Sequence, residues 1–306
     1  MDTSLDLVTG NCYNFIKREI SVLEKIIDGK SIANSRETIL KSRCDVIKQK
    51  GIEPKLAVIL VGNDSASEIY VRFKQKAAKK IGIKSELIRL PDRSDINSIY
   101  KQINFLNKDT SVHGILLQLP LPRNINKEET ENLIQSILPE KDVDGLHPQN
   151  LGLIGTSKGF IACTPLGCLR LLGSTKNKII GSRALVVGRS RIVGRPMASL
   201  LTSVNATVTV AHSKSLKLDE RVRESDILIA AAGSPLLIKG EWIKEGATVI
   251  DVGIHRTDSG KLIGDVDFQS AYHRASAITP VPGGVGPMTI SSLMENVCLA
   301  AERRLF

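Results

Sequence analysis

The chain has 306 residues, of which 42% are hydrophobic and 24% are charged. This balance is typical of a soluble globular protein, and the length is enough for one large domain or two of ordinary size. No apolar run approaches the roughly 20 residues of a membrane-spanning helix. Asp6, Lys17, Arg18 and Glu19 interrupt the apolar positions near the start, so the continuous apolar core of a secretory signal is lacking. We therefore expect a cytoplasmic protein that does not engage a membrane.

The formal net charge of +10 predicts an anionic partner. Nucleic acid, a membrane surface and a phosphorylated cofactor all meet that requirement. Aromatic residues make up only 4% of the chain, and no RNA- or DNA-binding motif is recognisable. Nothing besides the charge supports the nucleic-acid interpretation. We therefore expect no nucleic-acid partner.

The cysteines are odd in number and widely scattered. There are five of them: Cys12, Cys44, Cys163, Cys168 and Cys298. No CxxC pair recurs at zinc spacing, which argues against both a disulfide framework and a zinc site. We expect free thiols and no metal.

The first half of the chain alternates between helical and strand patterns. An amphipathic pattern ends near Gly51, and the apolar run KLAVILVG between Pro54 and Gly62 predicts a strand buried on both faces. A helix is then expected over 65–81, with Gly82 ending it. SELIRL and HGILLQLPL follow as strands, and 96–106 and 127–137 as helices. Such alternation is typical of an α/β domain.

A second alternating region follows a turn-rich segment, LPEKDVDGLHPQNLGLIG, which has the composition of a hinge or an active-site loop. This region contains RALVVGRSRIVGRP, TVTVAH, DILIAAAG and TVIDVG. The sequence therefore predicts two α/β lobes with a cleft between them, and small ligands usually bind in such clefts.

The second lobe opens with a candidate nucleotide-binding loop. Gly188 allows a tight turn after the strand, and Gly194 with Pro196 begins a helix whose free N–H groups can hold phosphate oxygens. The loop is not a GxGxxG fingerprint, because it reads GRSRIVG and has glycine only at its two ends. An ordinary strand-to-helix turn is therefore the alternative.

The next strand indicates which dinucleotide would bind. NAD-binding folds carry an acidic residue about 20 residues beyond the loop for the ribose hydroxyls, but TVTVA runs into His212, Ser213 and Lys214. Ser213 and Lys214, together with Arg189 and Arg191, suit an additional phosphate. The sequence thus favours NADP over NAD, with solvated loop charges as the alternative.

Tyr70 and Lys74 stand four residues apart in the expected helix over 65–81, so they share one face. A lysine in an apolar site can exchange a proton near neutrality. One alternative is that both residues are exposed on the surface and have no catalytic role. A second is a short-chain dehydrogenase, because those enzymes also use YxxxK. In those enzymes, however, the pair follows the nucleotide loop, whereas here it precedes it by more than a hundred residues.

Three further polar residues occupy informative positions. Gln118 interrupts GILLQLPLP at the end of an expected buried strand, where ligands of α/β folds bind. In KDVDG, either Asp142 or Asp144 could accept hydrogen bonds from an amino-heterocycle, and loop capping is the alternative for both.

At this point the sequence strongly resembles the bifunctional methylenetetrahydrofolate dehydrogenase/cyclohydrolase family, the FolD type. The resemblance extends from about Ile26 to the end of the chain, in the family's order. The matching runs are IIDGKSIA, SEIYVRFKQKAAKKIGI, GILLQLPLP, PEKDVDGLHPQNLG, CTPLGC, VVGRSRIVGRP, VIDVGI, GDVDF and ITPVPGGVGPMT.

The resemblance implies a role for each candidate residue. Lys74 would be central to the hydrolysis, with Tyr70 orienting it and Gln118 tuning it. Substrate contacts would come from Tyr70, Gln118, Asp144, Pro282 and Gly283. NADP contacts would come from Thr164, Gly188, Arg189, Ser190, Ser213 and Ile254.

The resemblance also implies the reactions and the assembly. NADP-dependent oxidation of 5,10-methylenetetrahydrofolate would be followed by hydrolysis to 10-formyltetrahydrofolate, a one-carbon donor in purine biosynthesis. The folate-binding catalytic domain would comprise residues 1–148 and 282–306, and the Rossmann-like NADP domain residues 149–281. A homodimer acting on tetrahydrofolate derivatives with polyglutamate tails is expected.

Some features depart from the family or limit the interpretation. The first two dozen residues precede the family's usual start, and Leu153 and Ala162 stand where a basic residue and a proline are common. No GxxxxGK[ST] loop is present, so no ATP-dependent ligase activity is expected. A relative with only one of the two activities remains the main alternative. A basic nucleic-acid-binding protein derived from an inactive enzyme is the other.

Overall fold

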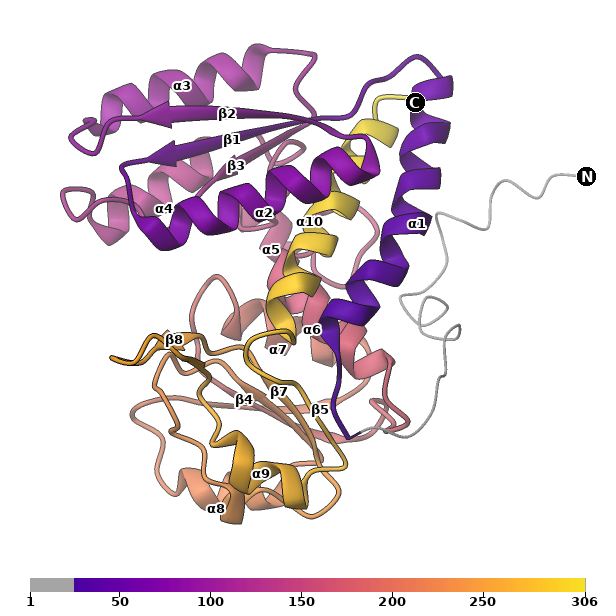
Figure 1. Cartoon of the computed structure of the whole chain (residues 1–306), viewed down its shortest axis with the longest axis vertical. Coiled ribbons are helices and arrows are strands. Elements are labelled where there is room, and N and C mark those ends of the chain that lie inside the picture. Colours follow the sequence, from indigo (N-terminus) through magenta and orange to yellow (C-terminus); the bar gives the residue numbers. More distant parts are fainter. Residues whose placement is uncertain (1–24, 306) are drawn as a thin grey trace, which may run out of the picture. The chain divides into compact units, whose positions relative to one another are not determined.

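The computed structural model describes residues 25–305, which form two compact units (Figure 1). One unit comprises residues 34–153, 158–163 and 290–305 and contains a sheet of three strands; we call it the three-strand unit. The other comprises residues 25–33, 154–157 and 164–289, contains a sheet of five strands, and is called the five-strand unit. Cys12 and the segment before the family's usual start lie outside the described residues.

The three-strand unit alternates strands and helices as the sequence predicted. Its strands are β1 (Lys55–Val61), β2 (Lys84–Leu90) and β3 (Gly114–Leu117). Its helices are α2 (Ser65–Ile81), α3 (Ile96–Lys108), α4 (Lys127–Ser136) and α5 (Pro148–Gly152), together with most of α1 (Gly29–Gln49) and α10 (Val285–Glu302). The strands are parallel in the order β2-β1-β3, so β1 is central.

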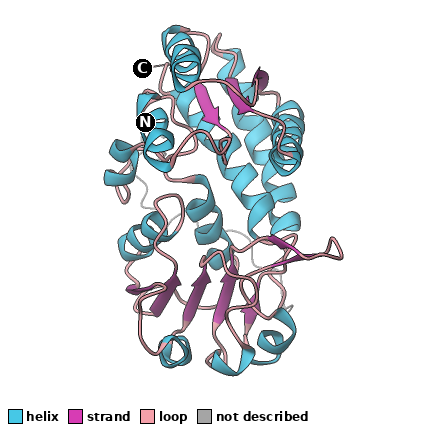
Figure 2. Cartoon of the chain, turned by 90° about the vertical axis from the view of Figure 1, so that its left-hand side faces the viewer, coloured by secondary structure: helices cyan, strands magenta, loops and turns pink. Residues whose placement is uncertain are grey.

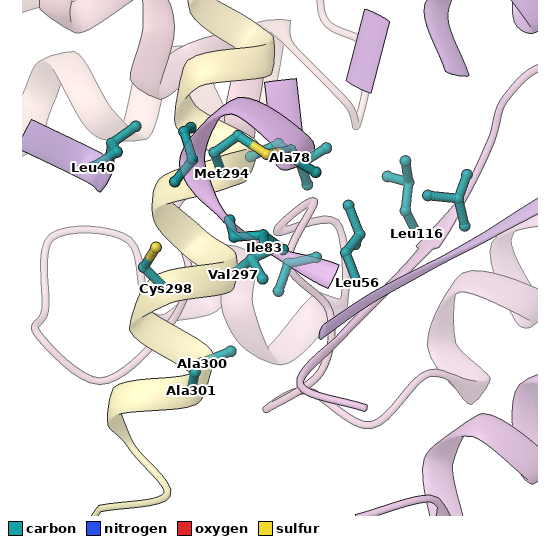
Figure 3. Close-up of a cluster of buried hydrophobic side chains, with 14 of the residues drawn as sticks. Leu40, Leu56, Ala78, Ile83, Leu116, Met294, Val297, Cys298, Ala300 and Ala301 are labelled. Carbon is teal, nitrogen blue, oxygen red and sulfur yellow. The ribbon is translucent and has the colours of Figure 1, made fainter. Parts of the chain in front are cut away.

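The continuous apolar run of β1 is explained by cover on both faces of this sheet. Leu56, Val58 and Leu60 belong to one buried cluster, and the alternate residues Ala57 and Ile59 belong to another. Figure 3 shows the first cluster, to which Leu56 of β1 and Met294 and Val297 of α10 all belong. Because successive side chains of a strand point to opposite faces, a strand with two buried faces has no polar positions.

The five-strand unit is built around a second parallel sheet (Figure 2). Its strands are β4 (Arg183–Val187), β5 (Thr207–Ala211), β6 (Ile227–Ala230), β7 (Thr248–Asp251) and β10 (Ala277–Ile278), in the order β10-β7-β6-β4-β5. Its helices are α6 (Cys163–Gly173), α7 (Gly194–Ser203), α8 (Leu218–Glu224), α9 (Phe268–Arg274) and the 3-10 turn η2 (Gly240–Trp242). A short antiparallel pair, β8 (His255–Arg256) and β9 (Leu262–Ile263), completes the unit.

These two parallel sheets confirm the predicted α/β class. One element is shorter than expected: HGILLQLPL was predicted as a strand, but β3 ends at Leu117. Gln118 still donates its backbone N–H to the Ile59 carbonyl, at 2.9 Å, and a cis peptide bond then joins Leu119 to Pro120. Proline has no N–H to offer to a strand partner, so pairing stops where the polar residue begins.

The boundaries of the two compact units fall at different residues from the predicted domain boundaries. Residues 25–33 group with the five-strand unit because Ile27 donates its N–H to the Ile278 carbonyl, at 2.8 Å. Pro282 and Gly283 also belong to that unit, which extends to Thr289. The predicted division by ligand, folate for one domain and NADP for the other, stays a prediction.

No helix in residues 25–305 has the length and apolarity that crossing a membrane requires.

Candidate active site

Helix α2 presents the predicted pair, Tyr70 and Lys74, on one face. Asp64 begins the helix by accepting a hydrogen bond from the Ser67 N–H, at 2.7 Å. Gly82 ends it in the left-handed conformation, at φ 91°. Since the residues buried in the core are Ser67, Val71, Ala78 and Ile81, the half-buried Tyr70 and Lys74 lie at the edge of this buried stripe.

Lys74 donates a hydrogen bond from Nζ to Oε1 of Gln118, at 2.8 Å. Gln118 is buried, with 7% of its surface exposed, and its own Nε2 donates to the Leu119 carbonyl. The amide N–H₂ is therefore occupied by the backbone while its oxygen faces the lysine. A buried amide held in this way fixes the position of the ammonium group. The structure thus brings together two of the predicted catalytic residues.

The surroundings of Lys74 favour loss of its proton. Burial lowers the pKa of Lys74 below the ordinary lysine value, and the negative charge of Asp144 opposes that decrease. Burial likewise raises the pKa of Asp144, and the positive charge of Lys74 opposes that increase. Desolvation penalises the charged forms of both groups. A lysine in this state can act in acid–base chemistry close to neutral pH.

The two aspartates of KDVDG have different positions. Asp142 is buried and accepts hydrogen bonds from the His147 N–H, at 2.7 Å, and from Nδ2 of Asn150, at 2.9 Å. Its carboxylate is thus used to hold the loop. Asp144 instead interacts electrostatically with Lys74: its negative charge raises the pKa of Lys74, and the positive charge of Lys74 lowers the pKa of Asp144. The structure therefore favours Asp144 as the ligand-binding aspartate of the two that the sequence left open.

Sequence reasoning missed one residue of this site, Cys163. Cys163, treated there as an ordinary free thiol, donates from Sγ to the Val143 carbonyl at 3.2 Å and from its N–H to the Asp144 carbonyl at 3.1 Å. Burial raises its thiol pKa well above the ordinary value, so Cys163 is a neutral thiol at physiological pH. Ser67 precedes Tyr70 by three residues, and its buried Oγ has no hydrogen-bond partner within residues 25–305.

A cavity lies at the carboxyl ends of the strands of this unit. Its volume is about 630 Å³. The lining residues are Val61, Asp64, Asp92, Arg93, Pro120, Leu121, Pro122, Arg123 and Asn124. β2 and β3 both come after β1 in the chain, and they pair with it on opposite sides. The carboxyl end of β1 is therefore a topological switch point, where α/β folds bind ligands.

The predicted nucleotide loop follows β4 in the five-strand unit. Gly188 has φ 124°, and a side chain there would collide with the Ala231 carbonyl. Gly194 approaches the Gly188 carbonyl in the same way. Ser190 accepts hydrogen bonds at Oγ from the N–H groups of Val193 and Gly194, at 3.2 and 3.3 Å. Both glycines are thus required by close backbone approach.

The end of β5 lies beside this loop. β4 and β5 are paired up to Val187 and Ala211, and Gly188 donates to the Ala211 carbonyl at 2.8 Å. Arg189 and Ser213 each follow two residues after that last pair, and both are exposed. No acidic residue occurs between 212 and 217. The donors present therefore fit a dinucleotide with an extra phosphate, because a carboxylate at this place would repel it.

The loop after β6 is held by a carboxylate that the sequence reasoning did not single out. Asp265 is fully buried and accepts hydrogen bonds from the N–H groups of Ala232, Gly233 and Ser234, at 2.6 to 3.0 Å. Its Oδ1 also contacts Nε2 of His255, at 2.7 Å. This loop and Gly188 follow the adjacent strands β6 and β4, so Asp265 shapes the same edge of the sheet.

The remaining predicted residues all lie in the five-strand unit. Ile254 is exposed immediately before β8. Thr164, near the start of α6, accepts a hydrogen bond from the hydroxyl of Thr289, at 3.2 Å. Gly283, at φ 108°, follows a cis Val281–Pro282 bond, and Pro282 is exposed. These positions leave the predicted ligand contacts open to test.

Two family models match the chain over both units. Residues 27–144 match the catalytic domain of tetrahydrofolate dehydrogenase/cyclohydrolase, and residues 162–305 match the NAD(P)-binding domain of the same enzymes. The chain belongs to the tetrahydrofolate dehydrogenase/cyclohydrolase family. Tyr70, Lys74, Gln118 and Asp144 fall within the catalytic-domain match, and the loop that begins at Gly188 falls within the NAD(P)-binding match.

Other members of the tetrahydrofolate dehydrogenase/cyclohydrolase family are similar along nearly their whole length. The bifunctional protein FolD of Campylobacter concisus is 48% identical over 282 residues, which cover 92% of this chain and 99% of that protein. The crystal structure of the bifunctional enzyme FolD from Campylobacter jejuni has a TM-score of 0.88 at 47% identity, covering 91% of this chain and 99% of that one. The Trypanosoma brucei enzyme, crystallised with NADP and an inhibitor, has a TM-score of 0.85 at 37% identity, covering 94% and 99%.

Proposed function

We propose that this chain catalyses two consecutive reactions of one-carbon metabolism. It oxidises 5,10-methylenetetrahydrofolate to 5,10-methenyltetrahydrofolate with NADP, and it hydrolyses the methenyl product to 10-formyltetrahydrofolate. The observation that carries this proposal is the hydrogen bond from Lys74 to Gln118 beside Asp144, in a chain whose other unit has a loop suited to NADP. Membership of the family supports both activities.

In the oxidation, the chain contributes binding and orientation more than proton transfer. NADP, when bound, supplies the hydride acceptor. Gly188, Arg189, Ser190 and Ser213 would hold its phosphates, with Thr164 and Ile254 contributing further contacts. Asp144 would accept hydrogen bonds from the amino-heterocycle of the folate, and Tyr70 would pack against the same substrate. Pro282 and Gly283 would complete the folate contacts. Orientation of this kind lowers the barrier without a base.

In the hydrolysis, Lys74 would move the proton. Water adds to the cationic methenyl carbon, and neutral Lys74 accepts the proton that the water loses. The resulting ammonium then gives a proton to the ring nitrogen as its bond to that carbon breaks, and the hydroxyl on the carbon loses its own proton to the lysine, which is neutral again, and from there to solvent. This leaves the formyl group on the other nitrogen and releases one proton overall. Gln118 holds Nζ in place through these transfers, since its oxygen can accept from the amine and from the ammonium.

Lys74→Met should separate the two reactions. The variant loses the proton carrier, so we expect hydrolysis to fall by about 10²- to 10⁴-fold, while the oxidation continues and methenyl product accumulates. The two steps are followed separately by the absorbance of the methenyl compound. Lys79→Met, an exposed lysine of the same helix, is the matched control and should retain both activities. Hydrolysis that survives in Lys74→Met would contradict the assigned role, and a wild type active in one step alone would establish the single-activity alternative.

The preference for NADP should depend on Arg189. Hydrogen bonds to charged groups contribute about 1.5–3 kcal/mol, so Arg189→Ala should raise the KM for NADP by roughly tenfold or more and change the KM for NAD by less than about twofold. Steady-state oxidation with both cofactors measures this. Arg223, which is paired with Asp219 in the same unit, supplies the control Arg223→Ala. An equal loss with both cofactors would place Arg189 away from the extra phosphate.

The folate substrates would carry polyglutamate tails. The net charge of +10 and the exposed guanidinium groups of Arg93 and Arg123, at the cavity of the three-strand unit, support this extension. Asp64 and Asp92 also line this cavity. The Asp64 carboxylate accepts a hydrogen bond from the Ser67 N–H at the start of α2.

Polyglutamate binding can be tested by comparing mono- and triglutamate substrates. We expect the triglutamate to have the lower KM, with the difference disappearing at high salt because salt screens exposed charges. Arg93→Gln combined with Arg123→Gln should abolish the difference, whereas Lys101→Gln combined with Lys108→Gln, which removes two exposed charges elsewhere on the same unit, should preserve it. Equal KM values for both substrates in the wild type would exclude a tail site.

The proposal also includes the setting in which the enzyme works. We place it in the cytoplasm as a homodimer, and we assign its formyl product to purine biosynthesis as a one-carbon donor.

A further inference from the structure

A buried asparagine of α10 connects two segments of the three-strand unit that are far apart in the sequence. Asn296 has 3% of its surface exposed. Its Nδ2 donates to the Val143 carbonyl at 2.9 Å and to the Ile161 carbonyl at 3.0 Å. One carbonyl directly precedes Asp144, and the other lies two residues before Cys163. A single amide group therefore joins the two backbone segments that carry Asp144 and Cys163. These are the two residues that act electrostatically on the pKa of Lys74.

The two segments are also joined directly to each other. Cys163 donates to Asp144 through the backbone and to Val143 through its thiol, at 3.1 and 3.2 Å. Gly145, at φ 73°, lies so close to the second segment that a Cβ would be 2.6 Å from the Ala162 nitrogen. Packing this close leaves no room for one segment to move without the other. The position of Asp144 is therefore set by contacts on both segments.

Helix α10 is a rigid support for the asparagine. Its neighbours Leu293, Met294 and Val297 are buried in the cluster shown in Figure 3. Two ion pairs, from Arg36 to Glu295 at 2.6 Å and from Arg43 to Glu302, tie it to α1 within the same unit. Because the helix cannot shift without disturbing this cluster, Nδ2 of Asn296 stays within hydrogen-bonding distance of the Val143 and Ile161 carbonyls.

We propose that Asn296 is a positioning residue for the hydrolysis: it holds Asp144 where its carboxyl group faces Lys74 and the folate ring. This inference rests on the proposed function and deepens it. The Nδ2 group of Asn296 donates to Val143, Ile161 and the Cys163 sulfur. It acts through the backbone on either side of Asp144, and so it influences both the proton exchange of Lys74 and the binding of the folate.

The test compares Asn296→Ala with Asn107→Ala. Asn107 is a matched control because its side chain also bonds to the backbone of the same unit, donating to Ser136 and accepting from Leu138, away from Lys74. The negative charge of Asp144 raises the pKa of Lys74, so a displaced Asp144 should allow that pKa to fall. We expect Asn296→Ala to move the Lys74-dependent limb of the hydrolysis pH profile to lower pH, and to raise the KM for methenyltetrahydrofolate about tenfold with the KM for NADP unchanged.

Asn107→Ala should leave both the pH limb and the folate KM unchanged, whatever it does to thermal stability. Asn296→Ser keeps one hydroxyl donor and should recover part of the effect; it also carries the test if the alanine variant does not fold. If the folded Asn296 variants keep the pH profile of hydrolysis and the folate KM of the wild type, Asn296 has only a structural role and the proposal is wrong. Failure of the wild type to hydrolyse methenyltetrahydrofolate would instead overturn the proposed function, and is measured first.

Discussion

The bond between Lys74 Nζ and Gln118 Oε1, 2.8 Å long, is the interaction on which the catalytic account depends. It places a lysine with a lowered pKa against a neutral acceptor instead of a carboxylate. A carboxylate in direct contact would favour the ammonium form, whereas a neutral amide holds the nitrogen in place with less bias toward either protonation state. Asp144 supplies the opposing charge, and the balance between burial and that charge sets how readily the lysine exchanges a proton.

Both units place their functional residues at the same kind of position. In the three-strand sheet, β1 is followed by α2 and flanked by β2 and β3, so Lys74 and Gln118 come from elements that meet at the carboxyl edge. In the five-strand sheet, β4 occupies the equivalent position between β5 and β6. The loop that begins at Gly188 and the loop held by Asp265 follow β4 and β6 at that edge. Parallel strand order thus decides where side chains distant in sequence converge.

Much of this arrangement could be predicted from local patterns. The apolar run of β1, the spacing of Tyr70 and Lys74 and the glycines at 188 and 194 each reflect a short-range requirement: a doubly buried strand, a helix face, or close backbone approach. The family resemblance added roles that spacing alone could not assign.

The residues that escaped prediction act through contacts between distant segments. Asn296 is separated from Val143 by 153 residues, and Asp265 from Ala232 by 33. Nothing in the neighbouring sequence distinguishes such a side chain from an ordinary helix or loop residue. Cys163 is a free thiol, as predicted, but no cysteine pattern in the sequence could show its bond to Val143. The early end of β3 has a local cause instead, because Pro120 has no N–H to offer to a strand partner.

The most direct test of the central claim is the pH dependence of hydrolysis in Gln118→Glu. This substitution keeps the shape of the acceptor but adds a negative charge at the lysine. If the neutral amide is what leaves Lys74 able to lose its proton, the Lys74-dependent limb should move to higher pH, with hydrolysis at neutral pH falling by roughly tenfold or more for each unit of displacement, since one pKa unit corresponds to a factor of ten. An unchanged limb in a folded variant that still binds folate would contradict the account.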